Sequence, residues 1–245
     1  MPATTVLLNA PVTLSVQVPG QDTGSARIVW EARDQEPAFG PTYTISPKNN
    51  GAQWVEVEIE WPDGRRSFAA STFMANSPVV TWVAGALPIG ASPGADGGDG
   101  WNWSSSNPAP GSSAPSHQSN LASGLHEHWF TDAAATLDVS AGDTLFAWVY
   151  LDPANPPTEV MVAWNDGSSW EHRAYWGANA ITYGANGTAG RSFAGPLPAV
   201  GQWVKLSVPA RAVGLEGAVV NGMTFSQFDG RATWNDTGRA SADAN

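Results

Sequence analysis

Apolar and polar residues alternate along many short segments of this chain, and a period of two is the pattern of a β-strand with one buried face. Residues 55–61 show it most clearly, with Val, Ile and Trp at the odd positions and Glu at the even ones. The turn residues Pro62-Asp63-Gly64 follow, so residues 65–69 are predicted to return as the second strand of a hairpin. Helical periodicity is lacking except for a short turn near residues 209–212. The pattern therefore predicts an all-β protein.

Residues 1–77 are predicted to form a small antiparallel sandwich, with strands over residues 12–18 and 26–32 in addition to the hairpin. The two arginines after the turn are expected to lie opposite the glutamates of residues 56–60 and to help fix the register. The short strands, the regular turns and the lack of cysteine resemble an immunoglobulin-like domain of the bacterial surface type. That resemblance implies a spacer or connector.

A second domain is predicted over residues 78–240, after a boundary at Asn76-Ser77-Pro78. Its first strand precedes a long stretch rich in glycine and serine, and its other strands follow that stretch. The strands are expected over residues 79–83, 125–130, 135–139, 144–151, 159–165, 169–176, 203–208 and 219–228. Eight or so antiparallel strands in this length suit a jelly roll. The predicted fold class is therefore an immunoglobulin-like sandwich followed by a jelly-roll β-sandwich.

Charge and composition narrow the partners of the chain. Its 245 residues carry 11 Lys and Arg against 22 Asp and Glu, a net charge of −11. Such a surface repels nucleic acid, anionic membrane lipids and sulfated polysaccharides, so a neutral ligand is expected. The lack of cysteine excludes disulfides, thiol catalysis and Cys-ligated zinc. The first residues do not have the pattern of a signal peptide, and we expect a fragment of a larger multidomain protein that is secreted or on the cell surface.

Aromatic residues are concentrated between Leu145 and Tyr183. They are Phe146, Trp148, Tyr150, Trp164, Trp170, Tyr175, Trp176 and Tyr183. Trp and Tyr combine a broad apolar ring with a polar tip. Sugars have apolar C–H faces and hydroxyl groups that match both properties. The concentration therefore indicates a carbohydrate-binding surface.

The segment 144–151 is apolar on both faces, which predicts a central strand that is covered on both sides. Its aliphatic face, which includes Leu145 and Val149, suits the core between two sheets. Its aromatic face, which includes Trp148, has two interpretations. It either lines a groove or belongs to a core that a loop covers.

Asp166-Gly167 predicts a hairpin turn between residues 159–165 and 169–176. On the return strand, Glu171, Arg173 and Tyr175 share one side. Trp170, His172 and Trp176 share the other side. The first side offers donors, acceptors and a stacking plane for a sugar, whereas the alternative is a surface ion pair beside packed tryptophans. The predicted ligand-binding residues are Trp148, Trp164, Trp170, Glu171, His172, Arg173, Tyr175, Trp176 and Asn179.

Residues 148–153, 164–177 and 220–234 resemble a non-catalytic domain of large secreted bacterial proteins, some of them RHS/YD-repeat proteins. They also resemble jelly-roll carbohydrate-binding modules. The resemblance implies that the second domain binds a polysaccharide or oligosaccharide. It also implies a structural calcium ion between an early loop and the last strand, and the matching positions are Asp96, Asp99 and Asp236. The alternative for residues 96–100 is a plain flexible turn.

Two other functions are compatible with the sequence. One is a structural or protein-interaction module of a bacterial surface or RHS-type protein. The other is a metal-dependent cupin-like enzyme, in which His126, His128 and Asp132 would hold the metal ion. Cupins need a further histidine in a second motif, and His172 lies in unsuitable surroundings for that role.

Sequence motifs for catalysis are lacking. The chain has neither a Gly-x-Ser-x-Gly motif nor a phosphate-binding loop. Glycosidase chemistry needs two opposed carboxyl groups, one of which has a raised pKa. Glu159, Asp166 and Glu171 are available, but a surface hairpin does not desolvate a carboxyl group enough. We therefore expect a binding protein and not an enzyme.

Overall fold

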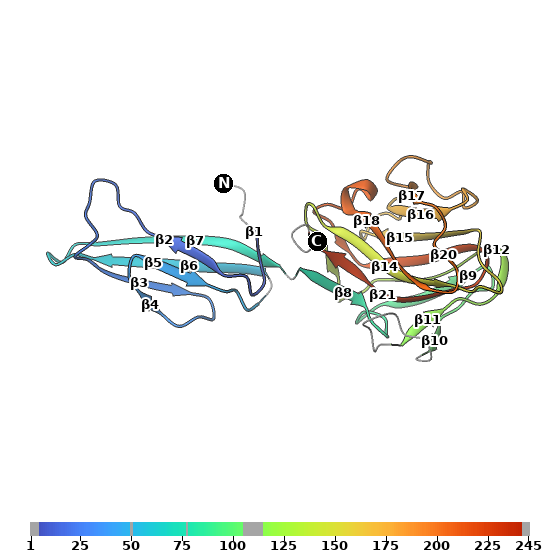
Figure 1. The fold of residues 1–245 in the computed structure, drawn as a ribbon, viewed down its shortest axis with the longest axis horizontal. Helices are drawn as coiled ribbons and strands as arrows, with labels where there is room; N and C mark the ends of the chain where they lie inside the picture. The colour runs from blue at the N-terminus through green and yellow to red at the C-terminus, as the bar shows by residue number, and fades with distance from the viewer. Residues whose placement is uncertain (1–4, 50, 77, 105–114, 242–245) are drawn as a thin grey trace. The chain divides into compact units, whose positions relative to one another are not determined.

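The protein is all-β, as predicted. The computed structural model describes residues 5–49, 51–76, 78–104 and 115–241. Among these residues the single helical element is the 3-10 helix η1 (Ala210–Val213), at the short turn that the sequence indicated (Figure 1). No helix in the described ranges is long and apolar enough to cross a membrane. The chain divides into two compact units, Met1–Pro78 and Val79–Asn245.

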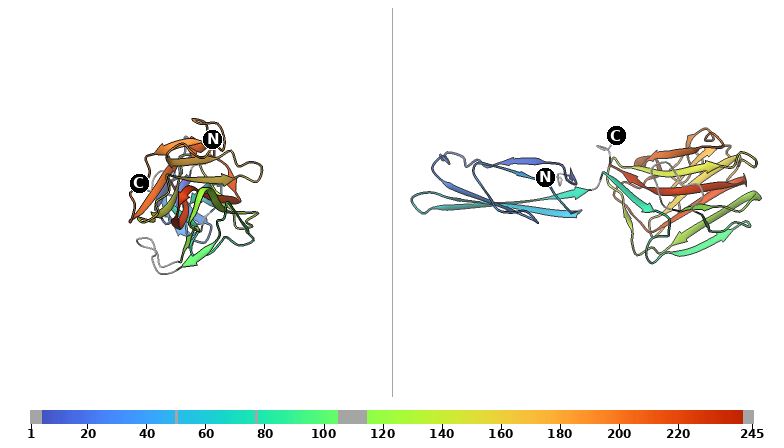
Figure 2. Two further views of the ribbon diagram at one scale, coloured as in Figure 1. Left: turned by 90° about the vertical axis from the view of Figure 1, so that its right-hand side faces the viewer. Right: turned by 60° about the horizontal axis from the view of Figure 1, so that its bottom comes forward.

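The first unit consists of a five-stranded sheet and a two-stranded sheet. The order in the larger sheet is β1 (Thr5–Leu7), β7 (Arg66–Asn76), β6 (Gly51–Glu60), β3 (Arg27–Ala32) and β4 (Ala38–Phe39). The smaller sheet pairs β2 (Val12–Ser15) with β5 (Thr42–Ile45). The predicted hairpin is formed by β6 and β7, which run along most of this unit in the right-hand view of Figure 2.

The alternation of residues 55–61 gives a segment with one buried face, as the sequence predicted. The odd-numbered residues are buried in the core of the first unit. On the other face of the sheet, the Arg66 guanidinium lies 3.2 Å from Glu58 Oε1 and 3.1 Å from Glu60 Oε1. Such exposed ion pairs contribute at most about 1 kcal/mol each, but they are specific to one register of the hairpin.

The second unit contains two six-stranded sheets, which we call the β21 sheet and the β20 sheet. The β21 sheet has the order β10 (Asn102–Ser104), β11 (Ser116–Gln118), β21 (Ala232–Ala240), β14 (Thr144–Leu151) and β18 (Trp203–Pro209), with β8 (Val79–Val83) also paired to β21. The β20 sheet has the order β17 (Ser192–Gly195), β16 (Arg173–Gly177), β15 (Glu159–Asn165), β20 (Gly222–Gly230), β12 (Ala122–Thr131) and β9 (Ser92–Asp96). A short pair is formed by β13 (Leu137–Asp138) and β19 (Val219–Val220).

Apolar side chains of both sheets form one core, so the second unit is a β-sandwich. From β14, the aliphatic residues Leu145 and Val149 are both fully buried in it, as the alternation predicted. From the β20 sheet, Val162, Phe225 and Phe130 contribute to the same core. The faces of the β20 sheet are therefore defined: one packs on the core and the other faces outward.

Several strands differ from the prediction, and β16 and β21 illustrate the reasons. β16 begins at Arg173 and not at residue 169, because the Asp166 carboxylate accepts hydrogen bonds from the backbone N–H groups of Ser168 (2.9 Å) and Ser169 (2.8 Å) and stabilises a wider turn. β21 has no counterpart among the predicted strands, because polar residues interrupt its apolar pattern. It is nevertheless central, paired with β14 on one side, and Trp234 within it is fully buried.

Candidate functional site

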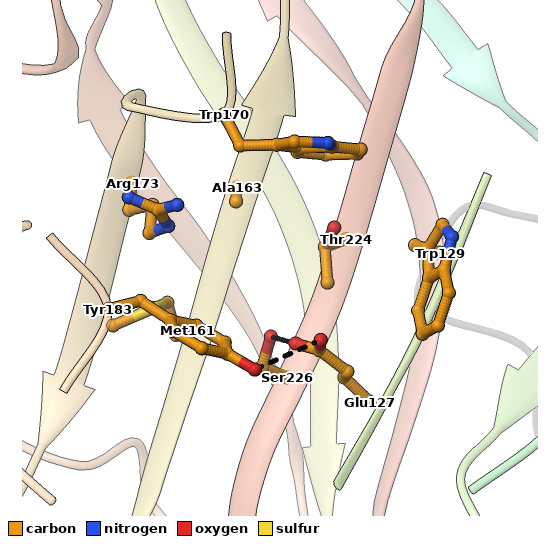
Figure 3. Close-up of a pocket in the computed structure, with 9 residues that line it drawn as sticks. All are labelled: Glu127, Trp129, Met161, Ala163, Trp170, Arg173, Tyr183, Thr224 and Ser226. Atoms are coloured by element: carbon orange, nitrogen blue, oxygen red, sulfur yellow. Dashed lines mark hydrogen bonds between the residues drawn. The ribbon is translucent and has the colours of Figure 1, made fainter. Parts of the chain in front are cut away.

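A pocket of about 220 Å³ opens on the outer face of the β20 sheet. Four adjacent strands, β16, β15, β20 and β12, carry most of its lining. The residues that line it are Glu127, Trp129, Met161, Ala163, Trp170, Arg173, Tyr183, Thr224 and Ser226 (Figure 3). All nine belong to the second unit.

Strand register arranges seven of the lining residues in two rows across the sheet. The first row is Trp129, Thr224, Ala163 and Arg173. The second row is Glu127, Ser226 and Met161. Residues that lie directly opposite each other on paired strands project from the same face of the sheet. The backbone pairing therefore brings together side chains from distant parts of the sequence.

Two indole rings stand at the border of this floor. Trp129 lies against the edge strand β9, where a Cβ atom at Gly94 would be 2.6 Å from Cε2 of the ring. Trp170 comes from the loop between β15 and β16, and its Cη2 atom would lie 3.3 Å from a Cβ atom at Gly222. Both indoles are half-buried. In each indole, one part of the ring therefore packs on the protein and another part borders the pocket.

Glu127 supplies a carboxylate to the pocket. Its Oε2 atom accepts a hydrogen bond from the Ser226 hydroxyl at 2.6 Å, and its Oε1 atom accepts one from the Tyr183 hydroxyl at 3.4 Å. Burial and the charge of Glu127 raise the pKa of Tyr183 above its usual value of 10.0. The Tyr183 hydroxyl is therefore protonated at neutral pH and donates. The carboxylate has lone pairs left for a ligand.

Arg173 supplies a guanidinium group and is only 9% exposed. Its Nη1 atom donates to Glu171 Oε1 at 2.8 Å and to the Gly190 carbonyl oxygen at 3.0 Å. Its Cζ atom lies 5.6 Å from the centroid of the Tyr183 ring, within the range of a cation–π contact. Among the described residues, no acceptor takes the N–H groups of Nε and Nη2. These groups are the donors that the pocket can offer.

The predicted binding residues divide into those at the pocket, those in the core, and others elsewhere. Trp170 and Arg173 line the pocket, and Glu171 supports it through its ion pair with Arg173. Trp164 and Trp176 were wrongly assigned as ligand-stacking residues. They are 2% and 6% exposed and belong to the core, because they project from the inner face of the same strands. A ring that both sheets cover has no surface on which a sugar can stack.

The other predicted residues lie outside the lining of the pocket. Tyr175 is on the outer face but is only 3% exposed and packs against Ile181, so the assignment of a stacking role to it was also wrong. His172 Nδ1 lies 2.7 Å from a backbone carbonyl oxygen. Trp148 is half-buried on the β21 sheet, which is the opposite sheet of the sandwich. Asn179 is exposed in the loop after β16.

Sequence reasoning missed several lining residues, chiefly Glu127, Trp129, Thr224, Ser226 and Tyr183. Glu127 and Trp129 alternate with buried histidines on β12, and this parity was the available indication that they face outward. Thr224 and Ser226 alternate with core residues on β20 in the same way. No local pattern shows that β12 and β20 are neighbours, so the sequence could not join these residues into one site.

Three carboxylates were expected to bind calcium, and the surroundings of one of them, Asp99, do not fit such a site. Asp99 Oδ1 accepts the backbone N–H groups of Gly100 and Asn120, at 2.7 and 2.8 Å. A calcium ion would meet these N–H groups and not oxygen ligands. Asp96 is exposed, Asp236 lies on β21, and among the described residues no group of three or more His, Cys, Asp or Glu side chains could hold a metal ion. Calcium binding stays a prediction, without a site in this structure.

The histidines considered for a cupin-like metal site instead form a buried network with Asp99. His128 Nδ1 lies 3.0 Å from Asp99 Oδ2, and His128 Nε2 lies 2.8 Å from His117 Nδ1. His126 Nδ1 is 3.0 Å from the side-chain nitrogen of Gln227, which also donates to Asp99 Oδ2 at 2.8 Å. His117 projects from the β21 sheet and His128 from the β20 sheet. The network therefore connects the two sheets through the core.

The charge states within this network follow from burial. Burial and the neighbouring His128 hold the pKa of His117 well below its usual value of 6.5, so His117 is neutral at pH 7. Burial alone would raise the pKa of Asp99, but the imidazoles of His126 and His128 hold it well below its usual value. Asp99 is therefore an anion in the interior, surrounded by N–H groups that stabilise it.

No family model matches the chain, and no curated protein matches it. Solved structures with a likeness to it include one that explains the promiscuous specificity of carbohydrate-binding modules from the beta-sandwich superfamily. It is 12% identical, with a TM-score of 0.42, and the match covers 96% of this chain and 93% of that chain.

Two further likenesses cover about half of the other chain. One is to the CBM51-2 and INT domains of Clostridium perfringens ZmpB with bound GlcNAc, at 11% identity and a TM-score of 0.28, over 94% of this chain and 48% of that one. The other is to Bacteroides ovatus SGBP-B, from a mixed-linkage glucan utilization locus, in complex with a mixed-linkage heptasaccharide. It is 10% identical, with a TM-score of 0.23, and the match covers 96% of this chain and 51% of that chain. These likenesses are too distant to indicate a function.

Proposed function

We propose that the second unit binds a neutral glycan, without catalysis, in the pocket on the outer face of the β20 sheet. The observation that carries this proposal is the pairing of two half-buried indoles, Trp129 and Trp170, with a floor of hydroxyl groups. An indole that borders a pocket offers an apolar surface to the C–H face of a sugar ring. The hydroxyl groups of Thr224 and Ser226 lie beside it, where the hydroxyl groups of that sugar would need partners.

The charged groups of the pocket suit a ligand that both donates and accepts hydrogen bonds. Glu127 accepts, while Nε and Nη2 of Arg173 donate. Because Glu171 neutralises Arg173 at 2.8 Å, the charge of Glu127 remains uncompensated. An anionic sugar would therefore be repelled locally, as it is by the net charge of −11. A neutral saccharide satisfies the polar groups without this repulsion.

The composition of the pocket also supports binding without hydrolysis. Glu127 is the single carboxylate among the nine lining residues. Hydrolysis of a glycosidic bond by the usual route needs two carboxyl groups about 5–9.5 Å apart on either side of the bond. A secreted or cell-surface location within a larger protein, with the first unit as a spacer, is part of the same proposal.

The test is a glycan array followed by titration calorimetry with the best neutral glycan of the array. Trp170→Ala and Trp129→Ala should each weaken binding at least about tenfold, since a buried aromatic anchor contributes about 2 kcal/mol or more. Trp54→Ala is the matched control, because Trp54 is 40% exposed on the first unit and should leave affinity unchanged. Unchanged affinity in both pocket variants would place the glycan elsewhere and contradict the proposal.

A second candidate function is that of a structural or protein-interaction module. It is favoured by two exposed rings on the sheet of the first unit, Phe39 at 68% and Phe68 at 71% exposure. Both rings lie on strands of the same five-stranded sheet, and large exposed apolar rings there suit a surface that another macromolecule covers. Uniformly negative results on the glycan array at high protein concentration would favour this second function.

A further inference from the structure

We infer that the pocket admits one saccharide unit at the end of a chain or branch, and that it excludes the interior of a polysaccharide. This inference rests on the proposed function and specifies the class of glycan. A site for the interior of a chain must be open at two ends, because the chain enters at one end and leaves at the other. The pocket does not have this shape.

Side chains border the floor of the pocket on every side in the plane of the sheet. Figure 3 shows Trp170 at the top, Trp129 on the right and Arg173 on the left, with Ala163 and Thr224 between them. The lower border consists of Tyr183, Ser226 and Glu127. The strands form the base of the pocket, so its opening faces away from the sheet. A ligand therefore enters with its end first.

The lower border is continuous because its members are hydrogen-bonded to one another. The Tyr183 hydroxyl donates to Glu127 Oε1 at 3.4 Å, and the Ser226 hydroxyl donates to Glu127 Oε2 at 2.6 Å. Tyr183 belongs to the loop after β16, whereas Glu127 belongs to β12, so their contact crosses two intervening strands, β15 and β20. A chain that ran along the sheet would have to break this contact.

The loop that carries Tyr183 is anchored at its base. The Glu159 carboxylate accepts the backbone N–H groups of Ala180 and Ile181, at 2.5 and 3.1 Å. Arg191 donates to the Ile181 carbonyl oxygen at 3.0 Å. Glu159 and Ile181 are both fully or almost fully buried. Displacement of the base of this loop by a ligand would therefore disturb buried contacts.

The volume of the pocket leads to the same conclusion. Pockets that enclose drug-sized molecules measure about 300–1,000 Å³, and this one measures about 220 Å³. It can enclose one sugar ring, whereas a second ring would project into solvent. Units beyond the first should then add little to the affinity.

The experiment is a calorimetric length series with five sets of soluble neutral oligosaccharides, derived from cellulose, xylan, mannan, galactan and an α-glucan. Each set runs from two to six units. For the set that binds, we expect Kd to change less than about threefold from the dimer to the hexamer, because all affinity comes from one unit. Partial hydrolysis of the parent polysaccharide should raise its binding capacity in proportion to the new chain ends. An affinity that increases more than about tenfold with length would overturn the inference while leaving the proposed function intact.

Two variants test the lower border of the pocket. Tyr183→Ala removes the lower border and should make the hexamer bind at least about threefold better relative to the dimer. Tyr183→Phe keeps the ring in place and should preserve the independence of length. Thermal melts show whether Tyr183→Ala is folded, and if it is not, the length series of the wild-type protein decides alone. Lack of binding by every oligosaccharide and every array glycan would overturn the proposed function as well.

Discussion

The two faces of the β20 sheet are built from the same strands, yet one packs on the core between the two sheets and the other carries the pocket. On the inner face, β12 presents His126, His128 and Phe130, which are all fully buried. On the outer face, the same strand presents Glu127 and Trp129, which are half-buried and line the pocket. β15, β16 and β20 repeat the pattern, with apolar residues inward and the pocket floor outward.

This comparison shows that the identity of an aromatic residue says little about its role. Trp164 and Trp129 are both tryptophans on strands of one sheet, but the first fills the core and the second borders a pocket. What differs is the face from which each residue projects. Position along the strand decides that face, since successive residues point to opposite sides.

The largest effect that we predict separates the two faces by stability. Trp164→Ala should lower the free energy of unfolding by about 3–5 kcal/mol, because it leaves a cavity in the core. Trp129→Ala should lower it by no more than about 1 kcal/mol, because this ring is partly in water already. Denaturant unfolding followed by circular dichroism measures both values. Equal losses would mean that the outer face is packed as tightly as the inner one.

The second prediction concerns the buried histidines of the inner face. His117 has a lowered pKa in the folded protein, so below pH 6.5 the unfolded chain binds a proton that the folded chain does not. Stability should therefore fall as the pH decreases from 6.5, by at most about 1.4 kcal/mol per pH unit for this one proton. Below its usual pKa of 3.8, Asp99 should add a further loss for the same reason. Denaturant midpoints between pH 7 and pH 3 measure the effect.

The control for this prediction is His117→Phe, which keeps an aromatic ring beside Trp101 and Phe225 but cannot take up a proton. In this variant the decline between pH 6.5 and pH 5 should become smaller. If the slope is unchanged, another group is responsible for the acid sensitivity of the inner face. The pocket should be less affected than the fold, because no histidine lines it.

A third, smaller effect is predicted for Gly94, which lies beneath the Trp129 ring. Gly94→Ala would place a methyl group 2.6 Å from Cε2 of that ring, so the indole must shift. We expect glycan affinity to fall by about three- to tenfold with little change in melting temperature. Gly98→Ala is a poor control because Gly98 has a positive φ of 84°. Ala95→Gly, on the same strand β9, is the better control. Equal glycan affinities for Gly94→Ala and wild type would show that the position of the Trp129 ring does not affect binding.

The smallest effect is expected from removal of metal ions. Asp99 is saturated by N–H groups, and the three predicted calcium ligands form no common site, so a chelator should leave the melting temperature unchanged. Differential scanning fluorimetry with EDTA, with and without added calcium, measures this. A clear rise in melting temperature with calcium would contradict this prediction and show that the protein has a calcium site.

The sequence predicted much of the fold. The segment 159–165 was predicted as a strand and is β15 with the same bounds, because its apolar run is bounded by turn residues. β21 was not among the predicted strands, because polar residues interrupt its apolar pattern and its partner strands are far away in the sequence. For example, Asn235 donates to Ser116 at 2.9 Å, across a sheet whose strands are far apart in the chain.

The candidate site was predicted only in part. Trp170 and Arg173 were found because they lie in the aromatic-rich hairpin, where residue types alone indicate binding. Trp164 and Trp176 were included for the same reason and are core residues. Trp129 was missed because its own segment also contains histidines that suggested a metal site. Residue types identified the hairpin, but they did not distinguish its two faces.

By itself, the sequence determined which residues share a face of a strand, because side chains alternate along an extended backbone. It also determined that the chain forms strands, has a strong negative charge and contains no cysteine. Only the tertiary structure decided which face of each strand is covered and which strands are neighbours. Coverage and pairing depend on segments far away in the chain, such as β12 and β20, whose contact places Trp129 beside Thr224.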